Sequence, residues 1–172
     1  GEGPRTIAQT VALLKVKSHA FEVVPALYWK RGVVLNSGAG ELIADLDDAM
    51  PNAAWDLLPM SKYRAHNWHA FESIEARSPY ASLHTSLGCP YRCNFCCINA
   101  PFGKSSYRMW SPKNVGDQLE ELVRSWGVRH VKFVDEMFVL NRAHVLGVCD
   151  EITRRGLGPD LNIWAYARVD TV

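Results

Sequence analysis

Four of the five cysteines of this chain fall within ten consecutive residues. The segment runs from Gly88 to Cys97 and reads Gly-Cys-Pro-Tyr-Arg-Cys-Asn-Phe-Cys-Cys. Thiolates are soft ligands, and such a concentration in one stretch is typical of a site for a metal or an iron–sulfur cluster rather than of core packing. We therefore expect the rest of the chain to act as a scaffold for this loop.

The spacing of the cysteines limits the kind of centre that the loop can hold. Cys89, Cys93 and Cys96 are separated by three and by two residues, so one short loop can place three thiolates around one centre. Cys97 follows Cys96 directly, and adjacent side chains point in different directions. A closed structural zinc site needs four ligands, usually as two pairs. Three cysteines that bind a cubane of four irons leave one iron without a protein ligand. Disulfide bonds between cysteines that lie so close together in the sequence would be strained.

The loop resembles that of the radical S-adenosylmethionine (SAM) enzymes, with Phe95 as the aromatic residue before the third cysteine. The resemblance implies that Cys89, Cys93 and Cys96 hold a 4Fe-4S cluster and that SAM chelates the fourth iron. An electron from the cluster then cleaves SAM into methionine and a 5'-deoxyadenosyl radical. The longer pattern is similar to the cobalamin-binding branch of the family, in the segments 85–89, 95–98, 107–108 and 111–112.

The residues before the loop resemble the end of a Rossmann-like cobalamin-binding domain and its linker, in the segments 27–30, 43–47 and 55–59. We accordingly expect a remnant of that domain over 1–50, a linker over 51–80 and an incomplete radical SAM core over 81–172. The Asp-x-His-x-x-Gly motif that binds cobalt in the family does not occur in this sequence. Because the chain lacks an initial Met and ends beside a strand-like run, we expect it to be an internal piece of a longer protein.

From Ala81 onward, strand and helix patterns alternate. We predict strands over 81–87, 128–134 and 161–168, and helices that begin at Ser111 and Asn141 as N-caps. This order predicts an α/β fold with two βαβ units and a parallel sheet. It resembles the first half, three βα units, of a partial TIM barrel, with the cysteine loop at the carboxyl end of the first strand.

The same patterns predict which faces are buried. A helix over 4–16 is amphipathic and should pack on another element, and Cys149 should be a small core residue of the second core helix. The third strand alternates between aliphatic and polar or aromatic residues. Its aliphatic face should meet the helices, whereas the other face should line a cavity.

The resemblance also implies residues that contact SAM. Phe95 lies where the family places an aromatic group near the adenine, and Asp135 or Glu136 after the second strand would accept from the SAM ammonium. Arg168 would pair with the carboxylate or ribose of SAM, and Arg108 matches the family's Tyr-Arg segment. The alternatives are loop packing for Phe95, helix capping for the carboxylates, a salt bridge for Arg168 and bracing of the loop for Arg108.

Composition excludes some partners. The 19 basic and 18 acidic residues leave a formal net charge of +1, which gives no electrostatic case for nucleic acid or an anionic membrane as a partner. No run approaches the ~18 to 20 apolar residues of a membrane span. Free thiols and an oxygen-sensitive cluster favour a reducing cytoplasm. The resemblance implies a small-molecule substrate and an electron donor such as flavodoxin or ferredoxin.

The sequence thus predicts an enzyme that cleaves SAM reductively, for cobalamin-dependent methyl transfer. One alternative is a radical SAM oxidoreductase or cyclase that does not use methylcobalamin. Another is a zinc-binding structural module without catalysis. We expect the chain by itself to be inactive, because half of the barrel and most of the cobalamin domain are absent from it.

Overall fold

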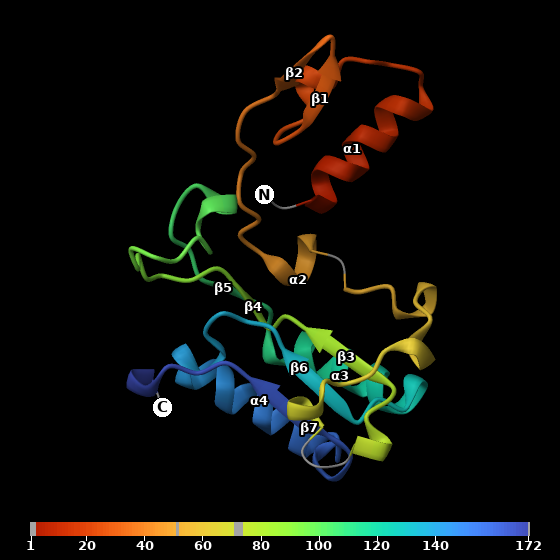
Figure 1. Cartoon of the computed structure of the whole chain (residues 1–172), viewed down its shortest axis with the longest axis vertical. Coiled ribbons are helices and arrows are strands. Elements are labelled where there is room, and N and C mark those ends of the chain that lie inside the picture. Colours follow the sequence, from red (N-terminus) through yellow and green to blue (C-terminus); the bar gives the residue numbers. More distant parts are fainter. Residues whose placement is uncertain (1–2, 51, 71–73, 172) are drawn as a thin grey trace.

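The computed structural model describes residues 3–50, 52–70 and 74–171. Figure 1 shows a helix and a hairpin at one end of the molecule and a sheet with two helices at the other. Short 3-10 helices occupy many of the connections: Phe21–Val23, Trp55–Leu57, Met60–Lys62, Asn67–His69, Ile74–Ala76, Ala100–Phe102, Phe138–Leu140, Gly158–Asp160 and Val169–Thr171. None of the described helices is both long enough and apolar enough to cross a membrane.

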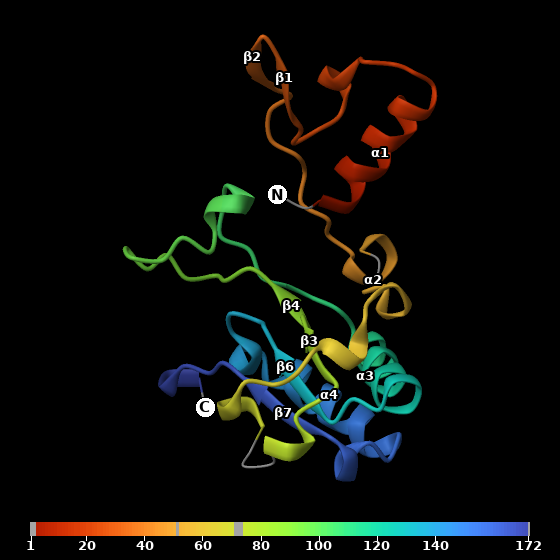
Figure 2. The same cartoon turned by 45° about the vertical axis from the view of Figure 1, so that its right-hand side comes forward.

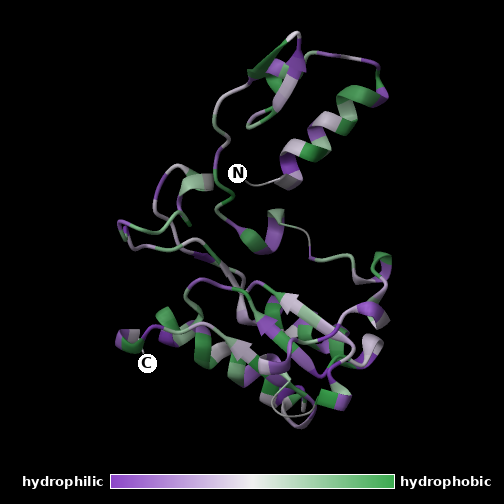
Figure 3. Cartoon of the chain, viewed as in Figure 1, coloured by the Kyte–Doolittle hydropathy of each residue, from purple (hydrophilic) through white to green (hydrophobic). Residues whose placement is uncertain are grey.

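The N-terminal part consists of helix α1 (Gly3–Lys15) and an antiparallel hairpin of β1 (Tyr28–Arg31) and β2 (Val33–Asn36). The predicted helix is confirmed, and hydrophobic and hydrophilic residues alternate along it (Figure 3). Its expected packing is not seen, because none of its described residues is buried. Figures 1 and 2 both show α1 and the hairpin apart from the sheet.

The chain then enters the core through a short helix, α2 (Leu46–Ala49). The side chain of Asp45 caps this helix by accepting a hydrogen bond from the backbone N–H of Asp48 at 3.1 Å. Leu46, and farther along Trp55, are buried in the hydrophobic core. The segment between α2 and the sheet therefore contributes to the core, although its described residues form only short helical turns.

Three parallel strands form the central sheet in chain order: β3 (Tyr80–Leu83), β6 (His130–Phe133) and β7 (Asn162–Ala165). Helix α3 (Pro112–Trp126) connects the first two strands, and α4 (Arg142–Arg154) connects the second and third. The predicted α/β class with two βαβ units is therefore confirmed. All three strands are shorter than predicted, and the third ends at Ala165 rather than at Arg168.

The first predicted strand, 81–87, is divided in two. After Leu83 the chain leaves the parallel sheet, and β4 (Ser86–Leu87) pairs antiparallel with β5 (Arg108–Met109). The physical reason lies at Thr85, whose backbone N–H donates to the carboxylate of Asp135 at 2.6 Å. Because this donor is taken by a side chain, the ladder with β6 does not continue past this point. The cysteine loop therefore follows a separate stem.

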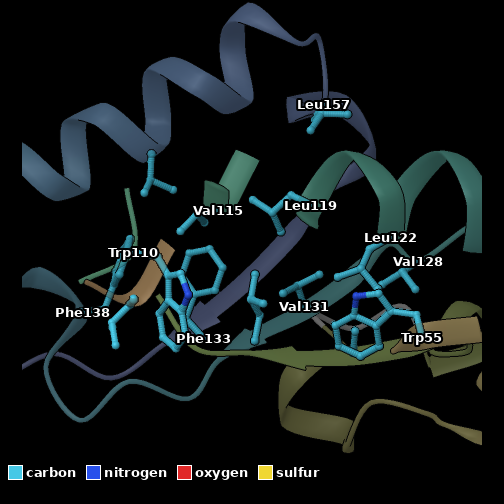
Figure 4. Close-up of a cluster of buried hydrophobic side chains, with 14 of the residues drawn as sticks. Trp55, Trp110, Val115, Leu119, Leu122, Val128, Val131, Phe133, Phe138 and Leu157 are labelled. Atoms are coloured by element: carbon cyan, nitrogen blue, oxygen red, sulfur yellow. The ribbon is translucent and has the colours of Figure 1, made fainter. Parts of the chain in front are cut away.

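One face of the sheet packs against α3 and α4. Figure 4 shows Val115 and Leu119 of α3 next to Val131 and Phe133 of β6. The helix termini follow the prediction. Ser111 caps α3 by accepting from the N–H of Asn114 at 3.1 Å, and Gly127 ends it in the left-handed conformation that glycine adopts most readily.

Helix α4 presents a different face to the core than predicted. Asn141 caps it, as expected, by accepting from the N–H of His144 at 3.0 Å. The buried residues are His144 and Val148, whereas Cys149 is exposed. The prediction that Cys149 is a core residue is therefore wrong. Cys149 follows the buried Val148 directly, and successive side chains point about 100° apart around a helix, so Cys149 faces solvent.

The opposite face of the sheet carries polar and aromatic side chains, as predicted. The ammonium of Lys132 lies 4.8 Å from the ring centres of both Trp164 and Tyr166 and donates to the Tyr166 hydroxyl at 3.2 Å. The ring of His69, from the segment before the sheet, lies 4.5 Å from Trp164. Burial, and then the charges of Lys132 and His66, lower the pKa of His69. That this face lines a cavity stays a prediction.

A cluster of charges joins α3 to α4. The Arg155 guanidinium binds Asp117 at 2.7 Å, Glu120 at 2.6 Å and Glu151 at 2.9 Å. A hydrogen bond from Lys113, and then bonds from Arg155, lower the pKa of Asp117, although burial opposes them. Bonds from neighbouring arginines likewise lower the pKa of Glu151. These carboxyls therefore stabilise the fold while they are ionised.

Leu119 is fully buried between α3 and the sheet. We expect Leu119→Ala to lower the free energy of unfolding by about 2–5 kcal/mol, because it leaves a cavity. The matched control is Leu146→Ala on α4, where the leucine is 46% exposed. It should change the free energy by less than about 0.5 kcal/mol. Urea unfolding followed by circular dichroism measures both, and equal losses would contradict the observed packing.

The charge cluster around Arg155 should make the stability of the protein depend on pH. Arg155→Met should destabilise the protein at pH 7, because three carboxylates then face one another without their shared cation. The contribution of a carboxyl with a lowered pKa is present above its unfolded pKa, near about 4, and is lost as the pH falls through the folded value. The difference in free energy of unfolding between variant and wild type should therefore shrink below about pH 4.

Arg124→Met is the control for this prediction, since Arg124 is exposed and, within the part of the chain that the structure describes, it forms an ion pair only with Glu120. It should cost little at either pH. Urea unfolding at pH 7 and pH 3 measures the effect, and an Arg155→Met difference that is unchanged or larger in acid would contradict the role of the charge cluster.

Candidate functional site

The cysteine loop projects from a narrow two-stranded stem. Strands β4 and β5 form the stem, and the N–H of Trp110 donates to the carbonyl of Thr85 at 3.0 Å. Gly88 has φ +85°, and a Cβ at this position would lie 2.4 Å from the carbonyl oxygen of Ser106. Only glycine allows the two arms to approach so closely. In Figures 1 and 2 the loop extends beyond the edge of the sheet.

The base of the stem rests on two buried polar side chains. Asp135, at the carboxyl end of β6, accepts hydrogen bonds from the hydroxyls of Thr85 and Ser86 as well as from the Thr85 N–H. The Nε2 atom of His144, in the first turn of α4, lies 2.9 Å from the Thr85 hydroxyl. Burial lowers the pKa of His144, although the charge of Asp135 opposes this shift.

The three predicted ligands line one pocket. Cys89 is buried and Cys93 and Cys96 are exposed, and all three border a pocket of about 490 Å³. Cys97 is not among the described residues that line it, in agreement with the expected divergence of adjacent side chains. The other lining residues are Tyr91, Arg92, Ile98, Asn99, Ala100, Gly103, Lys104 and Ser105.

Among the described residues, no group of three or more His, Cys, Asp or Glu side chains is arranged to hold a metal ion. The five cysteines are free thiols. The loop is ordered instead by its own turns: the N–H of Cys96 donates to the carbonyl of Cys93 at 3.1 Å, and the amide of Asn99 donates to the carbonyl of Tyr91 at 2.9 Å.

Arg168 connects the third strand segment to the loop. Its guanidinium lies 4.3 Å from the ring centre of Tyr91 and binds the Asp170 carboxylate at 2.7 Å. The hydrogen bond with Asp170 raises the pKa of Arg168. The structure therefore brings Arg168 to the cysteine loop across more than seventy residues of sequence, while also giving it the salt bridge that was the alternative expectation.

The remaining predicted site residues lie around the stem and loop. Arg108, in β5, donates to the carbonyl of Ile43 at 2.6 Å, so it braces the stem against the segment that leads into α2. Phe95 is 94% exposed. Glu136 is exposed directly after Asp135, whose oxygens are already engaged. Whether Asp135 or Glu136 contacts SAM stays a prediction, but only Glu136 presents its carboxylate to solvent.

Sequence reasoning missed Thr85, Tyr91 and His144 as contributors to the site. Tyr91 lies within the loop, yet its partner Arg168 is known only once β7 has been placed beside β6. The pairing of Thr85 with Asp135 likewise joins residues fifty positions apart. The only available signal was a hydroxyl pair before the loop and an acidic residue after a buried strand.

A second, larger pocket of about 720 Å³ lies where α2 meets the N-termini of α3 and α4. Its lining contains Asp45, Asp47, Trp110 and His144, but no cysteine. We place the candidate site in the smaller pocket, because the ligand chemistry of the chain is concentrated there.

No protein-family model matches the chain. It is 31% identical over 171 residues to an uncharacterised methyltransferase of Pyrococcus horikoshii, which covers 99% of this chain and 34% of that protein. It is 30% identical over 131 residues to an anaerobic magnesium-protoporphyrin IX monomethyl ester cyclase of Cereibacter sphaeroides, covering 76% of this chain and 19% of that protein. The chain thus spans about a third or less of the length of these relatives.

Two solved structures share the fold. One is the radical SAM methyltransferase TsrM of Kitasatospora setae with tryptophan substrate and a SAM analogue bound, with a TM-score of 0.62 and 21% identity over 97% of this chain and 32% of that one. The other is the cobalamin-dependent SAM radical enzyme OxsB, with a TM-score of 0.62 and 20% identity over 89% of this chain and 20% of that one.

These matches agree with the resemblance carried by the cysteine loop and with the parallel sheet behind it. The sequence of the chain is thus similar to those of a methyltransferase and a cyclase, and two radical SAM enzymes, one of them cobalamin-dependent, share its fold.

Proposed function

We propose that this chain binds a 4Fe-4S cluster and SAM and belongs to an enzyme that cleaves SAM reductively to a 5'-deoxyadenosyl radical. Cys89, Cys93 and Cys96 hold the cluster. The observation that carries the proposal is that these three cysteines line one pocket, whereas the neighbouring Cys97 lies outside its lining. Three thiolates leave one iron of a cubane without a protein ligand, which is the position that SAM fills.

The residues around the pocket fit such a group. The donor set is sulfur, and the pocket lining includes Arg92 and Lys104 but no acidic residue among those described. Arg168 adds a third cation at the loop. Basic side chains suit an anionic thiolate cluster and the carboxylate of SAM. When bound, the cluster supplies a single low-potential electron, which reduction of a sulfonium requires.

The number of ligands favours a cluster over zinc. A closed structural zinc site needs four protein ligands, usually as two pairs. The pocket is lined by three cysteines, and Cys97 is not among its described lining residues. Three thiolates suit a cubane that keeps one iron open better than a structural zinc ion.

We assign roles to the other predicted residues from their positions. Glu136 accepts from the SAM ammonium, because its carboxylate is exposed at the carboxyl end of β6. Arg168 binds the carboxylate or ribose of SAM from the end of the third strand, beside Tyr91. Phe95, which is almost fully exposed, is free to cover the adenine. Arg108 braces the stem rather than contacting SAM.

The same proposal includes the architecture of the whole enzyme. Residues 81–172 form the first half of a partial TIM barrel, which is supported by three parallel strands in chain order. Residues 1–50 end a Rossmann-like cobalamin-binding domain, and 51–80 link the two. The hairpin supports this division, because Tyr28, Val33 and Val34 are each about two-thirds exposed and need a covering surface.

We propose cobalamin-dependent methyl transfer to a small molecule as the reaction, with an electron donor such as flavodoxin or ferredoxin, in the cytoplasm. The methyltransferase relative, which aligns with nearly the whole chain, supports this choice. The cyclase relative supports the second candidate, a radical SAM oxidoreductase or cyclase that does not use methylcobalamin.

The cluster is tested by anaerobic reconstitution with iron and sulfide. We expect about four irons per chain and a broad brown absorption. Cys93→Ala should lose most of both, since it removes a ligand. Cys97→Ala and Cys149→Ala are the matched controls, because neither residue lines the pocket, and both should keep the wild-type iron content. Stoichiometric zinc without iron, or equal loss in all three variants, would refute the assignment.

The role of Glu136 is tested by the affinity for SAM. In the reconstituted protein, Glu136→Gln should weaken SAM binding on the order of tenfold, because it removes a charge-assisted hydrogen bond. Glu121→Gln on α3 changes an exposed glutamate in a helix that packs behind the sheet, and should bind SAM as the wild type does. Calorimetric titration measures both, and unchanged binding by Glu136→Gln would exclude this contact.

A further inference from the structure

Asp135 is a buried carboxylate whose role the proposed function leaves open. It is 1% exposed, and its oxygens accept from the Thr85 N–H at 2.6 Å, from the Ser86 hydroxyl at 2.9 Å and from the Thr85 hydroxyl. All three donors belong to the two residues that start the stem of the cysteine loop. A carboxylate with this set of partners is fixed in place and is not available to a ligand.

The protons of this network can be assigned from its partners. The Thr85 hydroxyl has one proton, which it donates to Asp135, so its lone pair faces Nε2 of His144 at 2.9 Å. His144 must then donate from Nε2 and be protonated there. Burial lowers the pKa of His144, so the imidazole is neutral near pH 7. The three groups together therefore carry one net negative charge.

No opposite charge compensates it. Among the described residues, no ion pair includes Asp135, and its partners are an amide, two hydroxyls and, behind one hydroxyl, a neutral imidazole. A buried charge that is held by hydrogen bonds alone acts strongly on its surroundings, because the local dielectric is low.

The charge lies under the cysteine loop. Thr85 precedes Cys89 by four residues, and the stem between them is held rigid by β5 and by the close approach at Gly88. Tyr107, on the other arm of the stem, donates to the carbonyl of Met137, two residues after Asp135, at 3.3 Å. Burial raises the pKa of Tyr107, a hydrogen bond with Ser86 opposes this shift, and the charges of Asp135 and Cys89 raise it further. Both arms of the stem are therefore attached to the segment that carries Asp135.

We infer that Asp135 is a positioning residue for the cysteine loop and that its fixed negative charge lowers the reduction potential of the cluster which the loop holds. His144 supports it by orienting the Thr85 hydroxyl. This inference rests on the proposed function for the cluster. Net charge and hydrogen bonding near a cluster are among the factors that set its potential, and a negative charge disfavours the addition of an electron. Reductive cleavage of a sulfonium needs such a low-potential centre.

The test compares Asp135→Asn with wild type in the reconstituted protein, without SAM. Asparagine keeps the shape and one acceptor but removes the charge. We expect an iron content equal to that of the wild type, a midpoint potential shifted to more positive values and an altered electron paramagnetic resonance spectrum of the reduced cluster. Asp150→Asn, an exposed aspartate on α4, is the control and should leave the potential unchanged. An unshifted potential in Asp135→Asn overturns the electrostatic role.

A second measurement uses the protein without iron, so that it does not depend on the cluster. We expect the amide hydrogen of Thr85 to exchange about tenfold faster or more in Asp135→Asn, because the charge-assisted bond is lost. In the reconstituted protein, Thr85→Ser keeps the hydroxyl and should keep the wild-type potential, whereas Thr85→Val should shift the potential to more positive values. Unchanged exchange overturns the positioning role. If the wild type binds no iron, the proposed function fails, and the exchange measurement still decides the positioning role.

Discussion

The structure depends on one carboxylate at the junction between the sheet and the cysteine loop. Asp135 takes the N–H and hydroxyl of Thr85 at the point where the first strand would otherwise continue along β6. The chain turns out of the parallel sheet there and starts the stem of β4 and β5. Asp135 thus lies where the pairing of β3 with β6 ends and the pairing of β4 with β5 begins, and this position determines where the three cysteines are held.

The rest of the molecule makes that junction rigid. Helices α3 and α4 cover one face of the sheet, and Arg155 joins them through three carboxylates. His144, in the first turn of α4, also contacts Thr85 at the base of the stem. Within the loop, the ring of Tyr91 lies against Arg168. The cysteine loop is therefore held from both β6 and the segment after β7, which suits a site where a cofactor must be kept in a fixed position.

Much of this fold could be predicted from local sequence. The caps Ser111 and Asn141, and the alternation of strands and helices, gave the α/β order, because these signals act within a few residues. The split of the first strand could not be predicted, since Thr85–Leu87 reads as a continuous strand and the group that interrupts it lies fifty residues later. Cys149 was misplaced because the periodic pattern did not decide between two adjacent helix faces. The spacing of the cysteines was enough to predict the three ligands, whereas the roles of Tyr91 and His144 follow only from contacts in the tertiary fold.

The central claim is that the loop leaves one iron open for SAM. Electron–nuclear double resonance on the reduced, reconstituted protein with SAM labelled by nitrogen-15 at its amino group tests this claim most directly. The account predicts a nitrogen hyperfine coupling of the size expected for direct coordination to iron. A fully formed cluster that gives no such coupling at saturating SAM would contradict it.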